Sequence, residues 1–138
     1  MHVVTVRSSI QLEHTRMSGS VCVIEDDDEL REVLSRVVRS VGLTPELYHS
    51  AESFLQRRDN SPIGCMLVDV QLGGLNGVAL LEHLAKNGSD CPFFLISGAH
   101  DAVSADTAKR LGAVIIDKPF NVRLLAQRIR TAVSATDR

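Results

Sequence analysis

The residues of this chain that could do chemistry directly follow short apolar runs. Glu25 and Asp26 follow Val-Cys-Val-Ile, and Asp69 follows Cys-Met-Leu-Val. Ser97 follows Phe-Phe-Leu-Ile, and Lys118 comes two residues after Val-Ile-Ile. Carboxylates a few ångströms apart repel each other, and a hard divalent cation such as Mg²⁺ relieves that repulsion. A carboxylate beside such a cation can attack phosphorus, while an ammonium and a hydroxyl neutralise the phosphoryl oxygens.

The elements that must position these residues are five apolar runs, each followed by a segment with helical spacing. The predicted strands are 21–24, 43–48, 63–68, 93–96 and 114–116. The first predicted helix begins after Asp27 or Asp28 and stops at Gly42, and the second runs from a Ser50 cap through Arg57. The third begins at Val78, the fourth spans Val103 to Leu111, and the fifth begins at an Asn121 cap.

Five alternating strands and helices predict an α/β domain with a parallel sheet and helices on both faces. In such sheets ligands bind beyond the carboxyl ends of the strands. We therefore expect the residues after the first, third, fourth and fifth strands to converge at one edge of the sheet.

Composition limits the class of protein. The chain has 138 residues, 44% of them hydrophobic, and a net charge of -2, which suits one folded domain without a strong field for nucleic acid or membranes. No apolar stretch reaches the roughly 18 residues that a membrane helix needs. Cys22, Cys65 and Cys91 form no C-x-x-C pair, which favours reduced thiols in a cytoplasmic protein. Residues 1–19 are expected to form a flexible tail, and residues 20–138 the domain.

Each candidate residue alone has an ordinary interpretation, such as a charged helix start for the acidic run or a turn for Asp69. Their joint placement at four strand ends makes coincidence improbable. Asp26-x-Asp28 also leaves open a phosphatase or phosphotransferase with an aspartate nucleophile after the first strand, although that enzyme would leave Asp69 unexplained.

With these residues in place, the sequence resembles the receiver domains of two-component response regulators over residues 20–135. The motifs are Val-Cys-Val-Ile-Glu25-Asp26-Asp27, Met-Leu-Val-Asp69, Leu-Ile-Ser97-Gly98 and Asp117-Lys118-Pro119-Phe120. The segment from Tyr48 onward is similar to receivers of the nitrogen-fixation and nodulation regulators. The resemblance implies a flavodoxin-like (βα)5 fold with strand order 2-1-3-4-5.

The resemblance also implies roles for the matching residues. Asp69 would accept a phosphoryl group and would bind Mg²⁺ together with Asp26 and the backbone carbonyl of Gln71. Glu25 would act through metal-bound water. The resemblance assigns the remaining roles as follows: Ser97 and Lys118 stabilise the phosphoryl group and switch the conformation, and the Lys118–Pro119 bond is cis. Gln71 and Ala99 lie two residues beyond Asp69 and Ser97, and we expect them to tune dephosphorylation.

Two departures from the family pattern bear on the switch. Leu72-Gly73-Gly74 replaces the usual Met-Pro after the acceptor, so this loop should be more flexible. Ile115 stands where an aromatic residue is common, so the usual inward swing of a ring is not available. These departures leave open an alternative, a receiver-like interaction module that is not phosphorylated.

The resemblance implies a bacterial, cytoplasmic phosphorelay protein whose donor is a histidine kinase or a phosphotransfer protein. Its only reactions would be Mg²⁺-dependent self-phosphorylation and self-dephosphorylation, so it would not be an enzyme in the ordinary sense. No helix-turn-helix segment is evident, and direct DNA binding by this chain is not expected. The face formed by the last helix, strand and helix is a candidate homodimer surface, and the downstream target is not identified by the residues.

Overall fold

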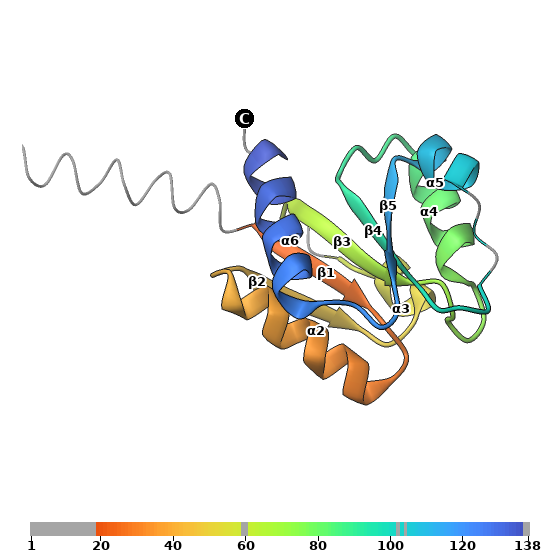
Figure 1. The fold of residues 1–138 in the computed structure, drawn as a ribbon. Helices are drawn as coiled ribbons and strands as arrows, with labels where there is room; N and C mark the ends of the chain where they lie inside the picture. The colour runs from red at the N-terminus through yellow and green to blue at the C-terminus, as the bar shows by residue number, and fades with distance from the viewer. Residues whose placement is uncertain (1–18, 59–60, 102, 104, 137–138) are drawn as a thin grey trace, which may run out of the picture.

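The computed structural model describes residues 19–58, 61–101, 103 and 105–136. In these residues five strands alternate with five helices, so the central sheet lies between two helical layers (Figure 1). The elements are β1 (Ser20–Ile24), α2 (Asp28–Ser40), β2 (Thr44–Tyr48), α3 (Ala51–Leu55), β3 (Ile63–Asp69), α4 (Gly77–Lys86), β4 (Phe93–Ser97), α5 (Ala105–Leu111), β5 (Ala113–Asp117) and α6 (Val122–Thr136).

The sheet has the order β2-β1-β3-β4-β5, and every neighbouring pair of strands is parallel. The predicted fold class and strand order are therefore confirmed. A connection between parallel strands needs a crossover, and α2, α3, α4 and α5 each supply one, while α6 follows the last strand. As a consequence, all five strands end at the same edge of the sheet.

The core has two halves because successive side chains of a strand point to opposite faces of the sheet. Val21 and Val23 of β1 face a cluster that includes residues of α2 and α6. Cys22 and Ile24 face the other cluster, which includes residues of α3, α4 and α5. Strands that are buried on both faces consist of continuous apolar residues, with no alternation of apolar and polar positions. This is why they can be recognised in the sequence as apolar runs.

The first helix has the ends that the sequence predicts. The Asp27 side chain accepts hydrogen bonds from the backbone N–H groups of Glu29 and Leu30, an N-cap worth about 1 kcal/mol. At the other end Gly42 has a φ of 81°, and its N–H donates to the carbonyl of Arg39 at 3.0 Å. A left-handed residue at this position stops a helix, and glycine adopts it without steric cost.

Two predicted helix boundaries were wrong. The helix expected over Val103–Leu111 begins at Ala105. The preceding turn is held by Gly98 and Asp101, whose backbone and side-chain hydrogen bonds join residues 98 and 101. The helix expected to run through Arg57 ends at Leu55, and the Arg57 backbone N–H donates to the Phe54 carbonyl at 2.9 Å, a three-residue spacing that closes the last turn. The Arg57 guanidinium binds Glu46 at 3.0 Å.

Cys22, Cys65 and Cys91 are free thiols, and the first two are buried. Burial raises the pKa of both Cys65 and Cys91 above its ordinary value, so these thiols stay protonated. Within the described ranges, no helix combines the length and the apolar character needed to cross a membrane.

Candidate functional site

The parallel strands bring the predicted residues to one edge of the sheet. Glu25 directly follows β1, and Asp69 is the last residue of β3. Ser97 ends β4 and is paired with Asp117 of β5, so Lys118 begins the loop beside it. Neighbouring strands are roughly 4.8 Å apart, which places side chains from separate loops within contact distance.

Asp69 and Lys118 form the centre of the site. The Asp69 side chain is only 2% exposed, and its Oδ2 accepts a hydrogen bond from Lys118 Nζ at 2.8 Å. Its Oδ1 accepts one from the backbone N–H of Gln71, also at 2.8 Å. Burial alone would lower the pKa of the Lys118 ammonium, but the hydrogen bond to Asp69 and the nearby acidic groups together outweigh burial, and the pKa is raised. The lysine therefore stays charged and compensates the buried carboxylate.

Glu25 is a second buried carboxyl group beside Asp69. It is 1% exposed, and its Oε2 accepts a hydrogen bond from the backbone N–H of Asp27 at 3.0 Å. Burial raises the pKa of Glu25 to about 9, and the neighbouring Asp69 carboxyl adds to the rise. Arg31 of α2 fixes the backbone at Glu25, since its Nη1 donates a hydrogen bond to the Glu25 carbonyl at 2.9 Å.

The donor atoms of this corner fit a magnesium ion. Glu25 Oε1 is buried and has no hydrogen-bond partner among the described residues, which leaves an acceptor in need of a proton or a cation. Asp26, which is exposed, lies beside Glu25 and helps to raise its pKa. In the part of the chain that the structure describes, no three acidic, histidine or cysteine side chains form a metal cage by themselves. Magnesium needs none, because it keeps several waters and takes one or two carboxylates.

Ser97 is buried at the same edge, but its hydroxyl is directed to its own loop. The Oγ donates a long hydrogen bond of 3.4 Å to the carbonyl of Gly98, while the Ser97 carbonyl accepts one from the Lys118 backbone N–H at 2.8 Å. Ala99, two residues further on, is exposed. The structure thus places Ser97 and Lys118 side by side through their backbones.

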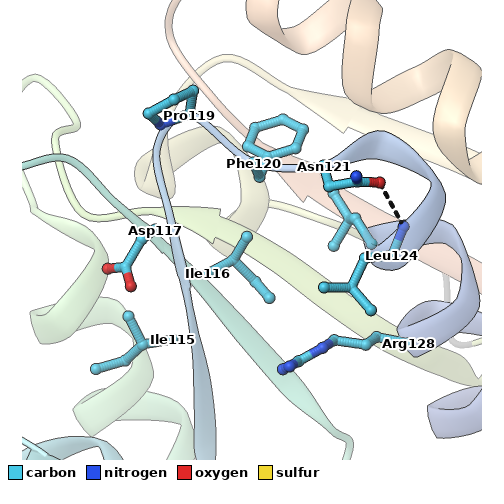
Figure 2. A pocket seen from close by; sticks show the side chains of 9 residues that line it. Ile115, Ile116, Asp117, Pro119, Phe120, Asn121, Leu124 and Arg128 are labelled. Atoms are coloured by element: carbon cyan, nitrogen blue, oxygen red, sulfur yellow. Dashed lines mark hydrogen bonds between the residues drawn. The ribbon is translucent and has the colours of Figure 1, made fainter.

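Ile115 lies on β5, below the turn that carries Lys118. Its side chain and that of Asp117 lie on one side of the strand, and Ile116 lies on the other (Figure 2). All three line a shallow cavity of about 230 Å³ that extends to α6. The Lys118–Pro119 bond is cis, as the resemblance implies, and Asn121 Oδ1 caps α6 by accepting the Leu124 N–H at 3.0 Å.

Sequence reasoning missed Asp101. The Asp101 carboxylate accepts hydrogen bonds from the Gly98 backbone N–H at 2.7 Å and from the side-chain amide of Gln71. It therefore connects the loop after β3 to the loop after β4. No periodic pattern marks a single aspartate in an irregular segment, so the sequence carried no signal for it.

Two glycines of the loop after β3 also have roles that the sequence did not reveal. A Cβ atom on Gly77 would lie 2.2 Å from the backbone oxygen of Asp69, so only glycine allows α4 to start this close to Asp69. Gly74 has a φ of 78°, and the Glu52 carboxylate of α3 accepts the Leu75 N–H beside it at 3.1 Å. The predicted flexibility of this loop stays a prediction, but Glu52 gives the loop an anchor.

Comparison with known proteins defines the class. A family model for the response regulator receiver domain matches residues 21–130. The chain therefore belongs to this family and is a receiver domain of two-component signalling.

The similar proteins include regulators of nitrogen fixation and nodulation, as the motifs indicated. The chain is 33% identical to the transcriptional regulatory protein FixJ of Bradyrhizobium diazoefficiens over 83% of this chain and 57% of FixJ. It is 34% identical to Nodulation protein W of the same organism over 91% of this chain and 55% of that protein. Response regulator protein TodT of Pseudomonas putida is 36% identical over 88% and 55%. The chain thus spans about half the length of the curated relatives it matches.

Solved structures agree with this assignment. Full-length FixJ from B. japonicum aligns with a TM-score of 0.74 and 33% identity, over 83% of this chain and 57% of FixJ. The receiver domain of the Francisella response regulator 1452 aligns with a TM-score of 0.77 over 86% and 98% of the chains, at 18% identity, which supports the fold alone.

Proposed function

We propose that Asp69 accepts a phosphoryl group from a histidine kinase or a phosphotransfer protein, in a Mg²⁺-dependent reaction that controls a partner. The observation that carries this proposal is the buried Asp69 carboxylate, bound by Lys118 at 2.8 Å and placed next to the unpartnered Glu25 Oε1. Acceptance by Asp69 explains why an acidic edge of the sheet also contains Lys118.

The transfer uses one oxygen of Asp69 as the nucleophile. That oxygen forms a bond to phosphorus, and the bond from phosphorus to the donor's imidazole nitrogen breaks with its electron pair leaving on the donor. Lys118 then binds a phosphoryl oxygen in place of the carboxylate oxygen that it binds now. In self-dephosphorylation water attacks the phosphorus, which releases inorganic phosphate and restores the Asp69 carboxylate.

The acidic corner would hold Mg²⁺ through Asp26, Asp69 and the backbone carbonyl of Gln71, with Glu25 acting through metal-bound water. When bound, the ion neutralises charge that builds up on the transferred phosphoryl group. Glu25 and Asp27 prepare this corner, because the Asp27 N–H fixes one oxygen of the Glu25 carboxyl and leaves the other oriented without a partner.

The phosphoryl group adds roughly two negative charges and three acceptor oxygens. It shifts the protein toward a second conformation only through contacts that are better in that conformation. Ser97 and Lys118 supply such contacts, and their shared backbone hydrogen bond couples β4 to β5. The signal would leave through α5, β5 and α6. It would not involve the movement of an aromatic ring, because Ile115 stands at the position where that ring is common. Gln71 and Ala99 flank the path of the hydrolytic water and set the lifetime of the phosphorylated form.

The face of β5 and α6 is the surface on which we place a partner or a second copy of the chain. Val114 and Leu124 are 42% and 49% exposed there, and both line a groove of about 410 Å³. Receiver domains of bacterial regulators usually work in the cytoplasm, and we place this one there. The boundary between a tail at residues 1–19 and a domain at 20–138 is part of the same proposal, since residues 1–18 lie outside the described residues.

The test is the intact mass of the protein after incubation with Mg²⁺ and acetyl phosphate. We expect one phosphoryl adduct in the native chain, none without Mg²⁺, and none in an Asp69→Ala variant. Asp106→Asn is the matched control, because it also removes one aspartate but lies exposed on α5. An adduct that persists in Asp69→Ala would show that another residue is the acceptor. No adduct with acetyl phosphate or with a phosphorylated histidine kinase would favour the interaction module.

A further inference from the structure

Asp101 contacts two of the loops that surround Asp69. Its Oδ2 accepts the Gly98 backbone N–H at 2.7 Å, its Oδ1 accepts the side-chain amide of Gln71, and its own N–H donates to the Gly98 carbonyl at 3.1 Å. Gln71 in turn donates its backbone N–H to Asp69. One carboxylate thus ties the residue after Ser97 to the residue that binds the acceptor.

The negative charge of Asp101 also acts on Lys118, the lysine that binds Asp69. The hydrogen bond from Gln71 holds the pKa of Asp101 below its ordinary value, and the Gly98 N–H and the Lys118 charge act in the same direction. A Cβ built on Gly98 would lie 3.5 Å from Asp101 Oδ2 and 4.0 Å from Lys118 Cδ, so carboxylate and lysine flank one glycine. Lys118 therefore lies in the field of three acidic side chains: Asp69 is in direct contact, and Glu25 and Asp101 act without a direct contact.

We propose that Asp101 is a positioning residue that holds Gly98 and Gln71 in the unphosphorylated arrangement, and that phosphorylation of Asp69 releases it. The proposal rests on the proposed function, because it concerns the same acceptor. Asp101 satisfies a backbone donor and an amide donor beside the acceptor, and a phosphoryl group brings three acceptor oxygens that compete for such donors. The added negative charge also repels the Asp101 carboxylate while it attracts Lys118.

The direction of the effect follows from this competition. A contact that exists in only one of two forms shifts their balance when it is removed. Loss of Asp101 should therefore favour the phosphorylated arrangement and tighten the binding of a phosphoryl analogue. A residue that merely supports the fold would have the opposite effect, since a loosened loop binds an analogue less well.

The experiment measures the affinity of the native chain for beryllium fluoride, a phosphoryl analogue, by calorimetry in the presence of Mg²⁺. We expect Asp101→Asn and Asp101→Ala to bind it roughly 3- to 10-fold more tightly, the equivalent of one hydrogen bond. Gln71→Ala should give part of this gain and add nothing to Asp101→Ala. Asp106→Asn, the same change of charge on an exposed helix, should leave the affinity unchanged. In the absence of metal and analogue, the Gly98 amide should exchange its hydrogen faster in Asp101→Ala.

The outcomes separate this inference from the proposed function. If the native chain binds no analogue and acquires no adduct, the proposed function fails, and the inference fails with it. If the native chain binds the analogue and Asp101→Asn binds it equally or less tightly, the inference is overturned while the function stands. Unchanged exchange at Gly98 would also overturn it, because the hydrogen bond to Asp101 would then not protect that amide. If Asp101→Ala fails to fold, the isosteric Asp101→Asn decides the question.

Discussion

Gly77→Ala tests how closely the start of α4 approaches the acceptor. The new Cβ would lie 2.2 Å from the backbone oxygen of Asp69, 2.9 Å from its carbonyl carbon and 3.1 Å from Val68 Cγ1. Since non-bonded heavy atoms rest at about 3.5 Å or more, α4 or the end of β3 must move by roughly 1 Å. The nearest obstacles are backbone atoms of a central strand, which cannot rotate away as a side chain would.

The magnitude follows from this displacement. Overpacking of this kind costs about 1–3 kcal/mol of stability, although alanine is otherwise the better helix former by about 1 kcal/mol. A shift of roughly 1 Å at the reacting group can reduce a rate about 10²-fold. The hydrogen bond between Asp69 and Lys118 is 2.8 Å long, and a shift of this size would break it. We therefore expect lower stability in urea unfolding and a 10- to 100-fold slower formation of the acetyl phosphate adduct.

Gly73→Ala is the matched control in the same loop. Around Gly73 the described residues leave the Cβ position open to 4 Å, and its φ is not in the left-handed region. This variant should be as stable as the native chain or gain up to about 1 kcal/mol, with an unchanged rate of adduct formation. The reasoning about close approach is refuted if Gly77→Ala matches Gly73→Ala in both stability and rate.

Three further changes test other parts of the structure. The hydrogen bonds from Arg57 hold the pKa of Glu46 below its usual range, and they contribute roughly 1–3 kcal/mol of stability. This stability is complete above about pH 4.3, the pKa of glutamate in the unfolded chain, and it is lost as the pH falls through the lower pKa of the folded state. Urea unfolding between pH 7 and pH 3 should show this loss, and Arg57→Met should flatten the curve. Magnesium at ten times its Kd should stabilise the native chain by about 1.4 kcal/mol, and a thermal melt of Asp26→Asn should show a much smaller gain; equal gains would contradict the assigned ligand. Gly42→Ala should cost about 1 kcal/mol because φ is 81° there, and an unchanged urea midpoint would argue against the helix stop.

One geometrical rule predicted from the sequence that the candidate residues meet at one edge of the sheet. Parallel strands end together, so Asp69, Ser97 and Lys118 could be placed side by side from the positions of three apolar runs alone. The structure brings Asp69 and Lys118 into direct contact and buries Ser97 at the same edge. Glu25 was predicted as an oxygen donor, but its nearly complete burial depends on the packing of neighbouring loops and could not be read from its place in the chain.

The contacts between loops could not be predicted in the same way. Asp101 and Glu52 each bind a loop that is distant in sequence. Asp101 lies in an irregular segment, and the helical spacing around Glu52 does not indicate which loop its carboxylate binds. Propensity also misplaced the start of α5, which begins at Ala105, after a turn whose hydrogen bonds join Gly98 and Asp101. Such contacts depend on the three-dimensional path of irregular backbone, for which the sequence contains no repeating signal.

The glycines that end the helices lie at the opposite rim of the sheet from the acceptor. Gly42, Gly88 and Gly112 all have positive φ and each precedes the next strand, so all three mark the amino rim. At this rim a substitution such as Gly42→Ala changes the free energy of unfolding far from the reacting groups, whereas at the other rim a substitution such as Gly77→Ala changes stability and reactivity together. Fluorescent labels or inserted loops at these glycine turns would therefore report on the domain without touching its reaction. The amino rim therefore allows a lineage of such domains to adjust its thermal tolerance without changing its signalling lifetime.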